Sequence, residues 1–135
     1  MSALTIKGHP GIGAKVRGIA LVAADNFSAR YDLNRITGVF SRPAHKLAGQ
    51  SYVGKVLILN AAKGGVATAW MLREMASRGI VPLALVFNSV NPILAQGAAF
   101  GAVTMLSGFE DNITGKVPNG ARVEIDPARR LLRVL

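Results

Sequence analysis

Three short apolar runs constrain the fold of this chain more than any other feature of its sequence. Each is almost free of polar residues and rich in branched side chains; they are Lys55–Leu59, Leu83–Phe87 and Ala102–Leu106. Runs of this length and composition are typical of strands covered on both faces of a parallel sheet. Helical segments separate them. Ala67–Arg78 has Trp70, Met71 and Met75 at helical spacing, which predicts that these three residues form its core face.

The remaining segments predict a mixed domain. Asn91 and Pro92 are predicted to be the cap and the first residue of a second helix, which should end near Ala99. Arg17–Ala23 reads as a strand that precedes the parallel core, while Arg122–Ile125 and Leu131–Val134 flank a turn signal and read as a closing hairpin. The 135 residues therefore predict one α/β domain, residues 1–135, with a short parallel β-α-β-α-β core and an antiparallel β layer.

Composition excludes several classes of protein. The chain has no cysteine, and His9 and His45 are its two histidines. A disulfide framework, a thiol nucleophile and a self-sufficient metal centre are therefore not expected, and no metal-binding residues are assigned. The apolar runs are far shorter than the roughly 20 residues of a membrane span, so we expect a soluble cytoplasmic domain that does not bind a membrane.

The formal net charge of +9 indicates an anionic partner. Residues 1–55 hold 8 Lys and Arg against 2 acids, so the excess is spread over the N-terminal part rather than packed into a tail. Nucleic-acid binding normally adds exposed aromatic residues or a basic stripe along a helix. With 6% aromatic residues and no such stripe, a small carboxylate or phosphate is favoured over nucleic acid.

The segment Asn60–Thr68 is the richest local motif. A strand ends, Gly64 and Gly65 follow, and a helix begins. Glycines let backbone N–H groups approach a ligand, the helix start carries partial positive charge, and Lys63 adds a full one. The turn is predicted to bind a substrate anion through Lys63, Gly64, Gly65, Val66 and Thr68. The alternative is a plain strand-to-helix turn. A nucleotide-binding P-loop is excluded because no Gly-Lys-Ser/Thr ending follows.

Two further segments supply candidate residues. Asn88 and Ser89 open the turn after the next strand, which should lie beside the first turn at the carboxyl ends of the sheet. Arg30, Tyr31 and Asp32 lie in a long polar segment and offer an anion donor, a hydroxyl and a carboxylate. Arg30 and Asp32 are predicted to contact substrate, although a surface loop with one anchoring aromatic accounts for them equally well.

These stretches together resemble the small, swivel-domain subunit of the aconitase X family. The resemblance covers nearly the whole chain, and its stretches in chain order are Gly18–Val22, Phe27–Asp32, His45–Gly49, Gly54–Leu57, Lys63–Thr68, Asn91-Pro92, Gln96–Ala98 and Val123–Asp126. The Lys63–Thr68 form, KGGVAT, marks a branch of that family. The resemblance implies a swivelling β/β/α fold.

It also implies a partner and an activity. The partner is a larger aconitase-like subunit that holds an iron–sulfur cluster or iron, so no cofactor is expected on this chain. Characterised relatives are hydro-lyases that remove water from small hydroxy acids such as cis-3-hydroxyproline or phosphomevalonate. In them the small subunit supplies a serine base from a Gly-Arg-Gly-Ser turn. Here Ala62-Lys63-Gly64-Gly65 stands at that place, so Gly65 replaces the serine.

The leading hypothesis is therefore the small subunit of a dehydratase that acts on a small hydroxy acid and is inactive alone. The general base is not identified, and Thr68 and Tyr31 are the candidate catalytic residues. The alternative is a non-catalytic anion-binding or regulatory module that has lost the serine. An isolated swivel domain would expose its docking face, so self-association of the lone chain is also open.

Overall fold

The computed structural model describes residues 4–8, 11–26, 33–34, 36–61, 66–89, 103–109 and 112–135. Its strands are β1 (Leu4–Lys7), β2 (Val16–Val22), β3 (Leu33–Asn34), β4 (Val39–Phe40), β5 (Val56–Ala61), β6 (Ala84–Ser89), β7 (Thr104–Ser107), β8 (Arg122–Asp126) and β9 (Leu131–Val134). Its helices are α1 (Val66–Arg78) and the 3-10 helix η1 (Ile113–Gly115).

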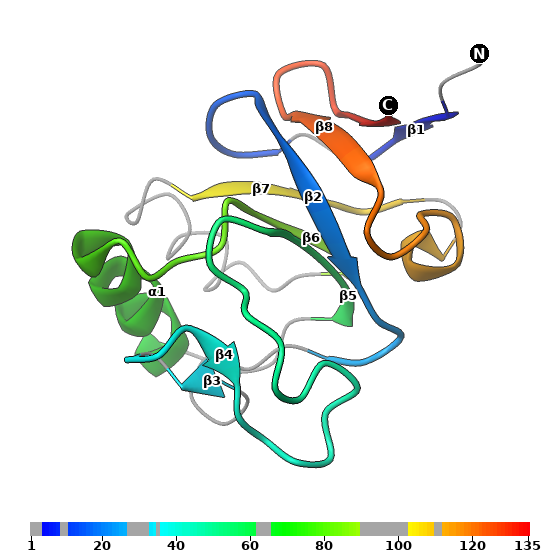
Figure 1. Cartoon of the computed structure of the whole chain (residues 1–135). Coiled ribbons are helices and arrows are strands. Elements are labelled where there is room, and N and C mark those ends of the chain that lie inside the picture. The colour runs from blue at the N-terminus through cyan, green and yellow to red at the C-terminus, as the bar shows by residue number, and fades with distance from the viewer. Residues whose placement is uncertain are drawn as a thin grey trace.

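One mixed sheet of seven strands organises the domain, in the order β1-β9-β8-β2-β5-β6-β7. Strands β2, β5, β6 and β7 run parallel, whereas β1, β9, β8 and β2 pair antiparallel. Strand β2 belongs to both halves: Val16 to Ile19 pair with β8, and Ala20 to Val22 pair with β5. The antiparallel layer therefore leaves the parallel strands at β2 and lies over them (Figure 1).

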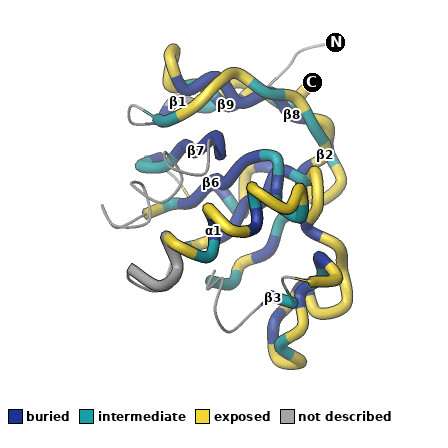
Figure 2. Tube along the Cα trace, turned by 90° about the vertical axis from the view of Figure 1, so that its left-hand side faces the viewer, coloured by how far each residue is buried: buried dark blue, intermediate teal, exposed yellow. Residues whose placement is uncertain are grey.

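Successive side chains along the parallel strands point to opposite faces of the sheet, and they form two separate cores. Val56 and Ile58 of β5 pack toward the antiparallel layer, with Val123, Ile125 and Leu132. Their neighbours point the other way: Leu57 and Leu59 pack toward α1, with Leu72 and Met75. Strands buried on both faces need apolar residues at every position, which is why the continuous apolar runs predicted them. The two cores separate three layers, the antiparallel strands, the parallel strands and α1 (Figure 2).

The core face of α1 differs from the prediction at one residue. Met75 is buried and Met71 is partly buried, as expected. Trp70 is 62% exposed, and the guanidinium of Arg73 lies 5.5 Å from its ring centroid. The predicted core role of Trp70 is wrong because Leu72 and Met75, three positions apart, form the buried stripe and turn Trp70 and Arg73 outward.

The polar segment 25–53 contains the small β3–β4 hairpin. Its turn is held by Asn34, whose Oδ1 accepts the N–H groups of Ile36 and Thr37 at 3.0 and 3.1 Å. Gly38 follows with φ of 79°, where a side chain would be strained and its Cβ would lie 2.5 Å from Val53. Strand β1 was likewise not predicted. The predicted helix from Asn91 to about Ala99 lies outside the described residues.

The predicted parallel core and closing hairpin are confirmed for the described strands. Strand β8 pairs with β9 and strands β5, β6 and β7 pair in chain order. In the part of the chain that the structure describes, no helix has both the length and the apolar character needed to cross a bilayer.

Candidate functional site

The parallel strands end together at one edge of the sheet. Strands β2, β5, β6 and β7 run in the same direction, so their C-terminal residues meet there. We call this the carboxyl edge; its described residues are Asp25, Asn26, Asn60, Ala61, Asn88, Ser89, Ser107 and Gly108. Open parallel sheets bind ligands at such an edge, which makes it the candidate functional site.

Asn88 ties this edge together. Its Nδ2 donates to Oδ1 of Asn60 at 3.0 Å and to Oδ1 of Asn112 at 2.7 Å. Its own Oδ1 accepts the N–H of Ile113 at 2.6 Å, and its carbonyl accepts the N–H of Gly108 at 3.2 Å. The side-chain amide therefore links the ends of β5 and β6 to η1, and the main-chain carbonyl of the same residue bonds Gly108, which follows β7. The first residues of the two predicted turns, Asn60 and Asn88, do lie side by side.

Asn112 fixes the entry to η1. Its Oδ1 accepts from the backbone N–H of Thr114 at 3.2 Å and from the Thr114 hydroxyl at 2.8 Å, in addition to Asn88. Ile113 is fully buried between the two sheet layers. The segment is thus anchored by a buried side chain on one side and by the Asn88 amide on the other, which limits its freedom at the edge.

Asp25 organises the end of β2. Its carbonyl accepts the N–H of Asn60 at 2.8 Å, and its carboxylate accepts the N–H groups of Asn26 and Lys46 at 2.8 and 3.1 Å. Burial alone would raise the pKa of Asp25, but the two backbone donors and the positive charge of Arg42 at 3.7 Å lower the pKa below its ordinary value. Asp25 is therefore ionised at neutral pH.

The predicted site residues fall largely outside what the structure describes. Arg30, Tyr31, Asp32, Lys63, Gly64 and Gly65 lie in undescribed stretches of the chain. Val66 is the first residue of α1 and Thr68 lies in its first turn. No acidic residue in that turn neutralises the partial positive charge of the helix N-terminus. Ser89 pairs with Ala61 across β5 and β6 and is exposed. Residues 62–65, which the structure does not describe, follow Ala61 at the end of β5 and precede Val66 at the start of α1.

His45, in the segment after β4, is buried beside the residues that follow β2, and its role is structural. Its Nδ1 accepts the N–H of Leu47 at 3.0 Å, so the proton sits on Nε2, which donates to the carbonyl of Asn26 at 2.8 Å. Its ring also stacks on Phe40, with centroids 4.6 Å apart. These contacts hold the segment 42–47 against the carboxyl edge.

Sequence reasoning missed the roles of Asp25 and Asn112 in this network. It places Asn60 at the start of the glycine turn, but not as a partner of Asn88. The signal is present in part, because Asn60 and Asn88 each follow an apolar strand of the same sheet. Asn112 carries no such signal, since it follows neither a strand nor a glycine motif.

Among the described residues no group of three His, Asp or Glu side chains could hold a metal ion, and the whole chain lacks cysteine.

A model of one protein family matches almost the full chain. The family is described as the aconitase X swivel domain, and the match spans residues 5–134. The chain belongs to the aconitase X swivel-domain family. The resemblance seen in the sequence is therefore confirmed.

Relatives and solved structures agree with the family. The phosphomevalonate dehydratase small subunit of Methanothrix thermoacetophila is 31% identical over 96% of this chain and 93% of its own length. The same subunit of Methanocella arvoryzae is 29% identical over 91% of this chain and 93% of its own. The crystal structure of Thermococcus kodakaraensis aconitase X in its holo form matches with a TM-score of 0.90 over 98% of both chains, at 23% identity. That likeness shows the fold.

Proposed function

We propose that this chain is the small subunit of an aconitase X-type hydro-lyase, and that the enzyme dehydrates phosphomevalonate or a closely related hydroxy acid. The supporting observation is similarity to phosphomevalonate dehydratase small subunits over nearly the whole length of both chains. A small subunit presupposes a larger partner. The proposal places the active site between that partner and the carboxyl edge.

The turn 62–65 is proposed to bind the substrate anion. It joins the end of β5 to the N-terminus of α1, where unpaired backbone N–H groups and the helix dipole favour negative charge. Lys63 would add a full positive charge, with Gly64, Gly65, Val66 and Thr68 lining the anion, and Arg30, Asp32 and Ser89 are proposed as further contacts. Such a clamp fixes the substrate so that its reacting carbon faces the base.

Asn88 is proposed to position this clamp. Both of its amide hydrogens and its amide oxygen are engaged within the chain. Holding the ends of β5 and β6 together fixes where the turn after β5 begins. A direct contact between Asn88 and substrate stays a prediction.

The reaction removes a proton from one carbon and hydroxide from its neighbour, which leaves a double bond and water. Gly65 has no group that takes the proton, so the base is proposed to be Thr68, Tyr31 or a residue of the partner. The iron–sulfur cluster or iron that the family implies would assist departure of the hydroxyl. The described part of this chain offers no ligand set for such a group, and the proposal assigns it to the large subunit.

A direct test is co-expression with the large subunit from the same source. The purified pair should dehydrate phosphomevalonate, and Lys63→Ala should lower kcat/KM about 100-fold or more, because the charge contacts the substrate anion. Arg78→Ala, which removes a cation from the other end of α1, is the matched control and should leave turnover unchanged. A pair that turns over no hydroxy acid overturns the proposal. A Lys63→Ala pair that equals the parent overturns the role of the turn.

Gly65 favours one alternative function, an anion-binding or regulatory module without turnover. It predicts that phosphomevalonate raises the Tm of the lone chain while no pair with a large subunit is catalytic. The same co-expression experiment separates the two, because they differ in whether product forms.

A further inference from the structure

The antiparallel layer has one face that the core does not use. Along β2, β8 and β9 alternate residues point inward, and Val123, Ile125 and Leu132 are fully buried. The intervening residues form the opposite side, which no element of the described chain covers. We call this side the outer face; it comprises Lys15, Arg17, Ile19, Arg122, Glu124, Arg133 and Leu135. The layer that carries the outer face, with β1, β9 and β8, lies at the top of Figure 2.

The outer face is strongly basic. The side chains of Lys15, Arg17 and Arg133 are 53%, 64% and 45% exposed, and Arg122 is exposed too. Its carboxylate, Glu124, is only 2% exposed. Solvent and any partner therefore meet cations, while the acid lies beneath them.

Glu124 holds the cations in register. Its Oε1 lies 3.1 Å from Lys15 Nζ, and its Oε2 lies 3.3 Å from Arg17 Nε and 3.5 Å from Arg133 Nη1. Arg17, Glu124 and Arg133 are register partners across β2, β8 and β9. One negative charge faces three positive ones, so the cluster keeps a net positive charge.

Apolar residues adjoin the cations. Ile19 is 38% exposed and pairs with Arg122, and Leu135, 45% exposed, donates its N–H to the Arg122 carbonyl at 2.8 Å. Interfaces between proteins combine apolar contact with charged rims. Nucleic-acid surfaces combine charge with aromatic stacking, and the outer face holds no aromatic side chain. A second copy of this chain is unfavourable because each copy carries +9.

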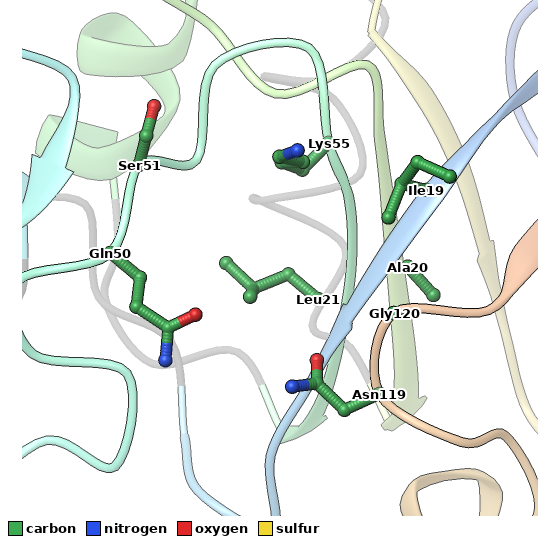
Figure 3. A pocket seen from close by; sticks show the side chains of 8 residues that line it. All are labelled: Ile19, Ala20, Leu21, Gln50, Ser51, Lys55, Asn119 and Gly120. Atoms are coloured by element: carbon green, nitrogen blue, oxygen red, sulfur yellow. The ribbon is translucent and has the colours of Figure 1, made fainter.

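A hollow of about 360 Å³ continues the outer face beside Ile19. Ile19 and Leu21 line it with apolar atoms, while Lys55, Gln50 and Asn119 surround it with polar groups (Figure 3). Asn119 also accepts the N–H of Val22 at 2.9 Å, so one of the residues that line the hollow is bonded to the last residue of β2. The hollow itself lies beside Ile19, Ala20 and Leu21 of β2 and beside Lys55, which precedes β5.

We propose that the outer face and this hollow dock an acidic, partly apolar surface of the large subunit, with a carboxylate side chain of the partner entering the hollow near Lys55. The inference rests on the proposed function for the identity of the partner. Beyond the proposed function, the inference identifies the docking surface on this chain, its positive charge and the residues that would contact the partner.

The test measures the affinity between purified small and large subunits. Arg17→Glu with Arg122→Glu reverses two charges of the outer face and leaves Lys15 and Arg133 to pair with Glu124. This variant should bind the large subunit about 30-fold or more weaker, as expected for reversed charges at an interface. Arg73→Glu with Arg78→Glu changes the net charge equally on α1 and should leave affinity within about 3-fold of the parent. Thermal melting checks that both variants fold.

A salt series on the unmodified pair provides a measurement that needs no variant. Affinity should fall by about tenfold or more between about 50 and 500 mM NaCl, because screening weakens exposed charge pairs. Ile19→Ala should also weaken binding without changing the salt dependence.

The outcomes separate this inference from the proposed function. A pair that forms and dehydrates substrate but binds the outer-face variant as tightly as the control overturns the inference alone. If no pair forms, the proposed function fails with it. If the free chain instead binds RNA or anionic vesicles through Arg17 and Arg122 while the large subunit ignores them, the acidic protein partner is wrong.

Discussion

Replacing Asn88 tests how much the carboxyl edge depends on one amide. Asn88→Ala removes bonds to Asn60, Asn112 and the N–H of Ile113. Asn60 and Asn112 are exposed, so water can replace Asn88 there at a cost of about 0.5 kcal/mol each. Ile113 is fully buried, and a buried donor without a partner costs about 1–3 kcal/mol.

The expected loss of unfolding free energy is therefore about 2–4 kcal/mol, or a Tm lower by about 6–16 °C for a domain of this size. Urea denaturation and calorimetry measure it, and amide hydrogen exchange at Ile113 should accelerate. Asn60→Ala, which removes one exposed bond, should cost about 0.5 kcal/mol. Asn88→Asp keeps the acceptor for Ile113 and should cost less than Asn88→Ala. An Asn88→Ala protein within about 0.5 kcal/mol of the parent would refute this reasoning.

Three further predictions concern the core, the β3–β4 turn and the outer face. Met75→Ala should cost about 2–5 kcal/mol in urea denaturation and Trp70→Ala less than about 1 kcal/mol; equal losses would contradict the assigned helix faces. Gly38→Ala should destabilise by about 1–2 kcal/mol because of its positive φ, whereas a stabilised variant would show that the turn relaxes freely. The Lys15 hydrogen bond lowers the pKa of Glu124; burial opposes it without cancelling it, and the charges of Lys15, Arg17 and Arg133 lower the pKa further. The stabilising contribution of Glu124 is present above the ordinary glutamate pKa and is lost as pH falls through the lowered one. Glu124→Gln should therefore flatten the acid side of the Tm–pH profile. An unchanged profile would contradict the stabilising role of the Glu124 ion pairs.

Much of the fold could be predicted because its central strands have a distinctive composition. Val56–Leu59 and Ala84–Phe87 are apolar at every position since both faces are covered, and runs this short and this rich in branched residues favour buried strands over helices. The hairpin at Asp126-Pro127 followed from turn chemistry. Strand β1 and the β3–β4 pair did not, because short edge strands derive their stability from partners that are distant in sequence.

The candidate site could be predicted as a place but not as a network. Strand ends mark the carboxyl edge, so Asn88 and Ser89 could be predicted to lie there, at the end of β6. The bonds of Asn88 to Asn112 and Ile113 span 24 and 25 residues, a separation over which no local pattern acts. Trp70 was misassigned for a related reason: helical spacing gives the period of a face, but not which of two possible faces the sheet will cover.

The outer face shows how charge depends on folding. The cations around Glu124 come from residues 15–17 and 133, near the two ends of the chain, and only the pairing of β2, β8 and β9 brings them together. In the sequence alone, the same residues are recognised only as part of a general excess of Lys and Arg. Their convergence over a buried acid is a property of the sheet.

Reconstitution of the two-subunit enzyme tests the central claim most directly. The large subunit alone should not dehydrate phosphomevalonate, and adding this chain should restore turnover that saturates at one small subunit per large subunit. Turnover that is equal with and without this chain, or absent at every ratio while the two proteins form a complex, would contradict the account.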